Sequence, residues 1–489
     1  MNPINDSRNT ASGEFGAAYF RKIRSQYVLT NDLGHYCLLR PKELQRYLSG
    51  QVEEGGLLHK RLKKSGFFNS AADDSAGQWQ KKHAYLWQRG PGLHIVVVTL
   101  RCNHKCLYCQ ASPANMRDRS TDMTLETAAK VVERIFATPN PTISIEFQGG
   151  EPLANWPAVR FIIERALELN HQFKKHLQIG LVSNLSLMDQ EKLEFLLEKG
   201  VSFCTSLDGP EDLHNRNRVY TGGSSYSEAA RWWRVIMQKT MRRKYRIDGL
   251  TTVTRFSLSR ARDIVNTYKA LGARGVYLRP LSPLGLARNT WGTIGYSPDE
   301  FAEFYRSALD YILELNLDKS GGIFVEQTAK MFLTKILLCE DPNQLDVRSP
   351  CGAGIGQMAY NFDGAVFTCD EGRMLSRMGD ESFRIGSVAA GSYAEAVEHP
   401  AVKAMAVASC LDNQPQCSLC AYKPYCGVCP IYNYVVQADI FGNMPSNARC
   451  RTYMGILDYL FEKLQQKRCR QVFQRWVTQD KRGRPYKQG

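Results

Sequence analysis

Apolar and polar residues follow two different periods along the middle of the chain. Six short apolar runs predict strands, at "HIVVVT" (94–99), "TISIEF" (142–147), "LQIGLV" (177–182), "SFCTSL" (202–207), "IDGLTTVT" (247–254) and "GVYLR" (275–279). Between them the spacing is helical, as in Leu125, Ala128, Val132 and Ile135, with Thr124 as the N-cap. Six βα repeats with short connections predict an α/β fold on a parallel sheet, either doubly wound or curled into a partial (β/α)6 barrel of the TIM type.

The two flanking regions have a different pattern. Before residue 90, two short strands around a turn at "NDLG" and two helices predict a small α+β unit, joined to the rest by a polar stretch at 69–83. Beyond residue 340, periodicity gives way to glycine, proline and cysteine. Such a composition can hardly build an apolar core, so metal is the expected organiser. We therefore expect four parts: 1–90, 91–340, 341–455, and a terminal helix with a basic tail at 456–489.

Composition and charge limit the class of protein. The chain is 43% hydrophobic and 23% charged, and its apolar runs fall far short of the roughly 20 residues that span a bilayer. Its start is polar, without an apolar leader, so we expect a cytoplasmic protein with no membrane partner. The net charge of +15 favours acidic partners. Solvated helix faces and a basic tail explain the densest basic runs, at 241–246 and near the C-terminus, more simply than a nucleic-acid site does.

The fifteen cysteines are unevenly spread, and in a reducing compartment such clusters point to metal rather than disulfides. Cys102, Cys106 and Cys109 follow the first strand. A structural zinc site needs four ligands, and His104 between the thiols is expected at the surface. Three thiolates suit a [4Fe–4S] cube with one open iron. Isolated cysteines are expected to be small buried hydrophobes, namely Cys37, Cys204, Cys339 and Cys469.

Other unusual sequences also follow predicted strands. "QGGEP" (148–152) follows the second strand, "SN" (183–184) ends the third, and "SLDGP" (206–210) ends the fourth. The carboxyl ends of parallel strands meet at one rim, where the chemistry of barrels of this kind is found. We therefore expect these segments to meet the three thiols at that rim.

CxxxCxxC, with Tyr108 before its last cysteine and "GGEP" after the next strand, resembles the cluster motif of radical S-adenosylmethionine (SAM) enzymes. The resemblance implies a [4Fe–4S] cluster on Cys102, Cys106 and Cys109, whose open iron chelates SAM. It implies that Glu151 holds the SAM ammonium group, that Gln148, Ser206 and Arg218 contact its carboxylate, and that Ser183 and Asn184 face its ribose. The implied cofactor-binding set is Tyr108, Gln148, Gly149, Gly150, Glu151, Pro152, Ser183, Asn184, Ser206 and Arg218. Each of these residues, taken singly, has a structural role as its simpler explanation.

The C-terminal cysteines resemble the SPASM extension of radical SAM peptide-modifying enzymes, which carries two auxiliary [4Fe–4S] clusters. The resemblance implies an outer cluster on Cys417, Cys420, Cys426 and Cys450, and an inner one on Cys351, Cys369 and Cys429. The spacing before Cys429 is shorter than in that family, so the division between clusters is less defined than the set. The fourth inner ligand stays open between Cys410, Cys339 and an open iron. A zinc ribbon is the alternative for "CSLCAYKPYCGVC".

The "CD" at Cys369 and Asp370 matches sulfatase maturases, in which that aspartate is the catalytic base; a hydrogen bond to backbone near the cluster is the alternative for Asp370. The N-terminal unit resembles the winged-helix-like domains that bind leader peptides by adding a strand. Together these motifs most resemble maturases of ribosomally made peptides, of the His-Xaa-Ser type. They imply oxidative crosslinking of a precursor peptide, with flavodoxin or ferredoxin as reductant. The alternatives are formylglycine formation and, from another class, an Fe–S protein that binds nucleic acid or senses redox state.

Overall fold

The computed structural model describes residues 18–68, 75–84, 90–240, 247–318, 322–342 and 345–478. The basic run at 241–246, the basic tail from residue 479 and part of the polar stretch at 69–83 lie outside the described residues. Within the described part of the chain, no helix combines the length and the apolar character needed to cross a membrane.

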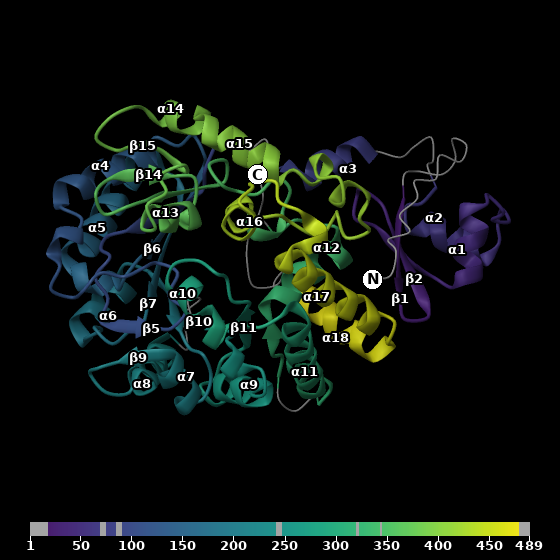
Figure 1. The fold of residues 1–489 in the computed structure, drawn as a ribbon, viewed down its shortest axis with the longest axis horizontal. Helices are drawn as coiled ribbons and strands as arrows, with labels where there is room; N and C mark the ends of the chain where they lie inside the picture. Colours follow the sequence, from purple (N-terminus) through teal and green to yellow (C-terminus); the bar gives the residue numbers. More distant parts are fainter. Residues whose placement is uncertain are drawn as a thin grey trace.

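One large sheet forms the centre of a mixed α/β fold (Figure 1). Its strand order is β12-β11-β10-β8-β7-β6-β4-β13-β14-β15, and neighbours from β12 to β13 are parallel. All six predicted strands are confirmed. The parallel strands are β4 (Leu93–Val97), β6 (Thr142–Gln148), β7 (His176–Ser183), β8 (Ser202–Ser206), β10 (Ile247–Thr252), β11 (Gly275–Arg279), β12 (Val325–Glu326) and β13 (Gln357–Tyr360).

The sheet has two edges, β12 and β15, and no pairing among the described strands joins them. This open sheet is compatible with both the doubly wound and the partial-barrel alternatives. Figure 1 shows α4, α5 and α6 side by side next to β6 and β7, and α9 and α11 next to β10 and β11. These helices, with the short ones at the rim, are α4 (Leu125–Phe136), α5 (Trp156–Phe173), α6 (Gln190–Glu198), α7 (Glu211–Asn217), α8 (Ser225–Thr240), α9 (Ala261–Ala270), α10 (Leu286–Ile294), α11 (Pro298–Leu317) and α12 (Gln327–Leu338).

Helix α4 illustrates why the period of the sequence predicts these helices well. The Thr124 side chain accepts a hydrogen bond from the Thr127 backbone N–H, so the predicted N-cap is confirmed. Val132 and Ile135 are fully buried, whereas Leu125 is half exposed. A single apolar stripe therefore packs the helix against the sheet.

The region after residue 340 is more regular than its composition suggests, so the expectation that it lacks an apolar core is wrong. Its strands extend the central sheet, with β13 parallel to β4, and Met358, Tyr360 and Phe367 are buried. Short strands covered on both faces have no alternation of apolar and polar residues, which explains why the periodicity of the sequence did not predict these strands. The other elements here are β14 (Ala365–Phe367), β15 (Arg384–Ser387), α13 (Asp370–Ser376), α14 (Tyr393–Glu398), α15 (Pro400–Ser409) and α16 (Pro430–Gln437).

The N-terminal unit contains a three-stranded antiparallel sheet in the order β1-β2-β3. The two predicted strands are β2 (Gln26–Thr30) and β3 (Tyr36–Leu39), and the two predicted helices are α1 (Pro41–Leu48) and α2 (Leu57–Lys64). The prediction misses β1 (Tyr19–Ile23) and α3 (Ser75–Lys82). Arg21 interrupts the apolar pattern of β1. Its guanidinium donates two hydrogen bonds, 2.8 and 2.9 Å long, to the carboxylate of Asp458, near the other end of the chain.

The predicted terminal helix is two helices, α17 (Ala448–Leu464) and α18 (Lys467–Thr478), with a break at 465–466. Figure 1 shows both helices between the central sheet and the N-terminal unit. Helix α17 packs mainly on α11 and α18 mainly on α12, and each also contacts the other's partner helix. The single-helix prediction is wrong, since one helix ends at Leu464 and a second begins at Lys467.

Candidate active site

The loop after β4 carries Cys102, Cys106 and Cys109. Inside it the short strand β5 (His104–Cys106) pairs antiparallel with β9 (Arg218–Tyr220), which places Cys106 opposite Arg218. Burial raises the pKa of all three thiols, that of Cys106 to about 12, and neighbouring thiols add to the rise at Cys102 and Cys106. Tertiary structure therefore gathers the three thiols in one place, where each cysteine is half-buried.

Three thiols on one loop suit an iron–sulfur cube with one open iron. A structural zinc site needs its four ligands around one ion, whereas a cube binds each cysteine on a separate iron. Cys102, Cys106 and Cys109 would hold such a cube.

Arg218 lies beside these thiols, held by a carboxylate that the prediction omits. Its Nη1 lies 3.8 Å from the Cys106 Sγ, while Nε and Nη2 donate to the Asp208 carboxylate at 3.1 and 3.2 Å. The Tyr108 hydroxyl donates to the same carboxylate at 2.5 Å, and the Arg218 guanidinium lies 5.1 Å from the Tyr108 ring centre. Asp208 is fully buried and, against the effect of burial, raises the pKa of Arg218. Asp208 of "SLDGP" thus joins Tyr108 to Arg218, and Arg218 in turn contacts Cys106.

"GGEP" lies against the start of the cysteine loop. Gly149 has a φ of +117°, and a Cβ on Gly150 would lie 2.3 Å from the Arg101 carbonyl oxygen. The backbone N–H groups of Gly150 and Glu151 donate to the carbonyls of Thr99 and Arg101 at 3.0 and 2.7 Å. Glycine is therefore required here because the two backbones touch.

The Glu151 carboxylate is almost wholly buried and accepts hydrogen bonds from the protein itself. The donors are the Ser183 hydroxyl at 2.7 Å and the backbone N–H groups of Asn184 at 2.9 Å and Leu153 at 3.1 Å. Burial nevertheless raises its pKa to about 7, because desolvation outweighs these bonds. Ser183 and Asn184, which are predicted to face a ribose, thus orient the Glu151 carboxylate by hydrogen bonds.

The remaining members of the predicted set lie at the same rim. Gln148 ends β6 and donates to Glu146, Pro152 begins the short 3-10 turn Pro152–Asn155, and Ser206 ends β8. The expectation that His104 lies at the surface is wrong: it is 2% exposed and stacks on Tyr220, with ring centres 4.5 Å apart. A histidine on a short loop gives no sequence signal of burial, because its partners come from β9 and α8.

The C-terminal cysteines lie in two apolar clusters. Cys417, Cys426 and Cys450 from α17 pack in one of them, and Cys351, Cys369 and Cys429 pack in the other. Cys339 lies elsewhere, with its Sγ 3.6 Å from the Gly34 carbonyl oxygen of the N-terminal unit.

Asp370 and Glu371 begin α13, directly after Cys369. The Asp370 carboxylate is 4% exposed and accepts a hydrogen bond of 2.6 Å from the fully buried Arg373. Glu371 instead lines a cavity that is partly open to solvent. Gln110, next to Cys109, and Cys429 line the same cavity, so it reaches both cysteine regions.

Comparison with known proteins agrees with this geometry. Residues 96–265 match the model of the radical SAM superfamily. A cysteine-type anaerobic sulfatase-maturating enzyme of Clostridium perfringens is 27% identical over 281 residues, which cover 55% of this chain and 71% of that one. The radical SAM cyclopropyl synthase TigE of Paramaledivibacter caminithermalis is 29% identical over 145 residues, covering 27% of this chain and 29% of TigE.

Solved structures share the fold. The structure of anSMEcpe with bound AdoMet has a TM-score of 0.65 and 21% identity, and covers 80% of this chain and 98% of its own. Streptococcus suis SuiB bound to its precursor peptide SuiA has a TM-score of 0.55 and 12% identity, and covers 88% of this chain and 98% of its own.

The cysteine loop, the parallel sheet and the family match define a radical SAM enzyme. Among characterised proteins, it is related to the anaerobic sulfatase maturases. In this class a [4Fe–4S] cluster and SAM, when bound, supply a 5′-deoxyadenosyl radical that removes a hydrogen atom from the substrate. The chain's own residues hold the loop, orient Arg218 through Asp208 and bury the site from water.

Proposed function

We propose that this enzyme oxidatively modifies side chains of a ribosomally made peptide or protein, forming a crosslink between two of them. The observation that carries the proposal is the cavity lined by both Gln110 and Cys429. A substrate held there lies between the radical-generating loop and a second group of cysteines. Joining two C–H carbons removes two electrons and two protons from the peptide, so a second redox centre beside the substrate suits this reaction.

Two auxiliary [4Fe–4S] clusters complete the proposal. Cys417, Cys420, Cys426 and Cys450 hold the outer one, and the packing of Cys417, Cys426 and Cys450 in one cluster supports this. Cys351, Cys369 and Cys429 hold the inner one. Of the two protein candidates for the fourth inner ligand, Cys339 is disfavoured by its contact with Gly34, which leaves Cys410 or an open iron.

The catalytic base is assigned to the "CDE" segment. Asp370 is the family's residue for this role, and it lies beside Arg373 and next to Cys369. Asp370 is almost completely buried, whereas a catalytic base must reach the proton that it removes. Substrate binding would have to open the Asp370–Arg373 contact.

The N-terminal unit is proposed to recognise the peptide. Its small sheet has edge strands β1 and β3, and an edge strand offers unpaired backbone groups to an extended peptide. The unit is joined to the C-terminal third by the Arg21–Asp458 pair and by the Thr30 hydroxyl, which donates to the Ala421 carbonyl at 2.8 Å. It thus lies directly beside the outer cysteine group.

The substrate subtype proposed is a peptide with His-Xaa-Ser repeats, in which a ring carbon is joined to a side-chain β-carbon. SuiB, which shares the fold, is seen with its precursor peptide SuiA, and this supports a peptide substrate. A flavodoxin or ferredoxin is proposed as the reductant. The site-residue assignments for SAM, including Gln148, Ser206 and Arg218, belong to the same proposal.

Formylglycine formation is the second candidate, favoured by the sequence similarity to two sulfatase-maturating enzymes. The two candidates leave different products. A crosslink removes two hydrogen atoms from the peptide, whereas the conversion of cysteine to formylglycine also exchanges sulfur for oxygen.

The test is an anaerobic assay of the reconstituted enzyme with dithionite, SAM and a synthetic His-Xaa-Ser peptide. We expect 5′-deoxyadenosine, and a peptide product lighter by two hydrogens that tandem mass spectrometry assigns to a crosslink. A Cys102→Ala/Cys106→Ala/Cys109→Ala variant should lose both, while Cys469→Ala, which alters a buried cysteine in α18, should keep both.

Each outcome separates the candidates. Deoxyadenosine with a modified sulfatase-type cysteine peptide, but an unmodified His-Xaa-Ser peptide, would favour formylglycine formation. Deoxyadenosine absent from a protein with full iron content would contradict the enzyme proposal and favour a redox-sensing or nucleic-acid-binding Fe–S protein.

A further inference from the structure

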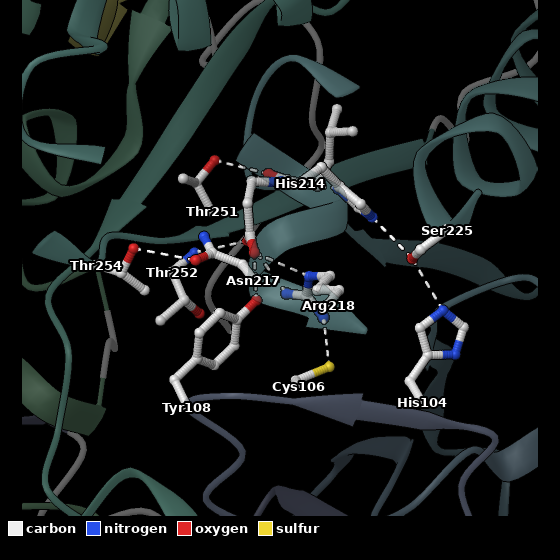
Figure 2. A network of polar contacts seen from close by, with 12 residues as sticks. His104, Cys106, Tyr108, His214, Asn217, Arg218, Ser225, Thr251, Thr252 and Thr254 are labelled. Carbon is white, nitrogen blue, oxygen red and sulfur yellow. Dashed lines mark hydrogen bonds and ion pairs between the residues drawn. The ribbon is translucent and has the colours of Figure 1, made fainter. Parts of the chain in front are cut away.

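A buried chain of hydrogen bonds links the loop after β8 to the cysteine loop. Figure 2 shows its centre, where Ser225 lies between His214 and His104. The Ser225 Oγ lies 2.9 Å from Nε2 of His214 and 2.8 Å from Nε2 of His104. His214 is fully buried, and Ser225 and His104 are each 2% exposed.

The geometry fixes the direction of the hydrogen bonds at the His214 end of this chain. The Asp208 backbone N–H donates to Nδ1 of His214 at 3.2 Å, so this ring is neutral and carries its hydrogen on Nε2. His214 therefore donates to the Ser225 Oγ. At His104 each tautomer has partners, because Nδ1 lies 3.1 Å from the Asn103 Oδ1 and 3.0 Å from the Asn184 Nδ2, and Nε2 bonds to the Ser225 hydroxyl in either tautomer.

The chain ends on the residues around Cys102. Nδ1 of His104 lies 3.1 Å from Oδ1 of Asn103, and the Asn103 amide is oriented because its Nδ2 donates to Ser186 at 2.7 Å. The same Oδ1 accepts from Nδ2 of Asn184 at 3.1 Å, and that nitrogen lies 3.9 Å from the Cys102 Sγ. One sequence of donors and acceptors thus runs from Asp208 to the contact with Cys102.

A second contact holds the histidine ring flat. His104 stacks on Tyr220 at an interplanar angle of 3°, and the two residues are opposite each other in the β5–β9 pairing. The ring is therefore fixed by its face and by both nitrogens. Because His104 lies between Cys102 and Cys106, its placement sets the path of the backbone between two proposed ligands.

We propose that His104, Ser225 and His214 are positioning residues that hold the cysteine loop in the geometry it needs to bind its cluster. They act through the Asp208 backbone at one end and Asn103 at the other. The loop is thereby preformed before the cofactor binds. Its shape does not depend on the cluster alone.

The first test is hydrogen exchange by mass spectrometry on the metal-free full-length protein. Ser225→Ala removes one oxygen and breaks both central bonds. We expect exchange of the amides at 103–109 to become about tenfold faster, the effect of losing roughly one buried hydrogen bond. Ser227→Ala, on the exposed face of the same helix, is the matched control and should leave these amides unchanged. Equal exchange in the two variants would overturn the proposal.

A second pair of variants separates the hydrogen bond from packing. His104→Leu keeps an apolar body against Tyr220 but removes the ring nitrogen that bonds to Ser225, and should accelerate exchange as Ser225→Ala does. His104→Gln retains a side-chain amide that can bond to Ser225 and should restore most of the protection. The double variant Ser225→Ala/His104→Leu should lose less protection than the sum of the two single changes, because both single changes remove the Ser225–His104 bond. Equal losses of protection in the Gln and Leu variants would contradict the proposed positioning role of the His104–Ser225 bond.

A third measurement concerns the loaded protein. After anaerobic reconstitution, the electron paramagnetic resonance signal that SAM alters reports the cluster of the cysteine loop. We expect an iron chelator to remove this signal about tenfold faster from Ser225→Ala than from Ser227→Ala. Identical rates of signal loss in the two variants would show that the hydrogen-bond chain through Ser225 does not stabilise the bound cluster.

Discussion

Arg218 and Asp208 form a buried ion pair beside the cysteine loop. The Arg218 Nε and Nη2 lie 3.1 and 3.2 Å from the two Asp208 oxygens, and the side chains are 8% and 0% exposed. The Thr252 backbone N–H also donates to this carboxylate, at 3.2 Å. Asp208 is therefore the point at which β10, Tyr108 and Arg218 are joined.

Replacing Asp208 with asparagine should leave the Arg218 charge buried without its partner. We expect the free energy of unfolding of the metal-free protein to fall by about 3 kcal/mol, measured by urea denaturation. Asp212→Asn is the matched control, because Asp212 pairs with Arg260 at the surface and should cost under about 1 kcal/mol. Similar losses for the two variants would contradict the burial argument.

Gly150→Ala should damage both stability and SAM cleavage. The new Cβ would meet the Leu100 and Arg101 backbone, which has no side-chain rotamer to give way. We expect a loss of about 3 kcal/mol in the free energy of unfolding and at least tenfold less deoxyadenosine. Gly292→Ala in α10, where a Cβ meets nothing within 4 Å, should change neither. Full activity of Gly150→Ala would show that the two backbones can separate.

Glu151 should make the stability of the metal-free protein depend on pH. Burial raises its pKa from 4.5 to about 7, so the folded state keeps a proton that the unfolded state has lost between these values. The free energy of unfolding therefore falls as pH rises from 4.5 to about 7, and the contribution of Glu151 to it no longer changes above about 7. Relative to Glu151→Gln, the wild type should lose roughly 3 kcal/mol between pH 4.5 and 7, measured by denaturation across that range. Parallel curves for the two proteins would mean that Glu151 is ionised when folded.

Asp370 and Glu371 should respond differently to removal of their charge. Asp370→Asn leaves the buried Arg373 without its partner, so we expect the free energy of unfolding to fall by about 3 kcal/mol. Glu371→Gln, at the wall of the cavity, should leave stability within about 0.5 kcal/mol and alter the rate of peptide modification. Stability is measured by urea denaturation and modification by mass spectrometry. A stable Asp370→Asn that cleaves SAM but no longer modifies the peptide would instead favour Asp370 as the base.

The elements that local pattern predicted well are those whose packing has one dominant face. The six apolar runs became β4, β6, β7, β8, β10 and β11. The period failed for β1, where Arg21 turns outward to Asp458, and for β13 and β14, which are covered on both sides. In each case the deciding partner comes from a distant part of the chain.

The sequence by itself determined the parallel sheet, the place of the three thiols after its first strand, and the glycines of "GGEP" that let two backbones touch. These features depend on residue type and local period, which act over a few positions. The tertiary structure alone decided that Asp208 is paired with Arg218, that His104 is buried against Ser225, and that Asp370 bonds to Arg373 while Glu371 lines the cavity. Such pairings depend on which loops meet in space, and no local spacing records that.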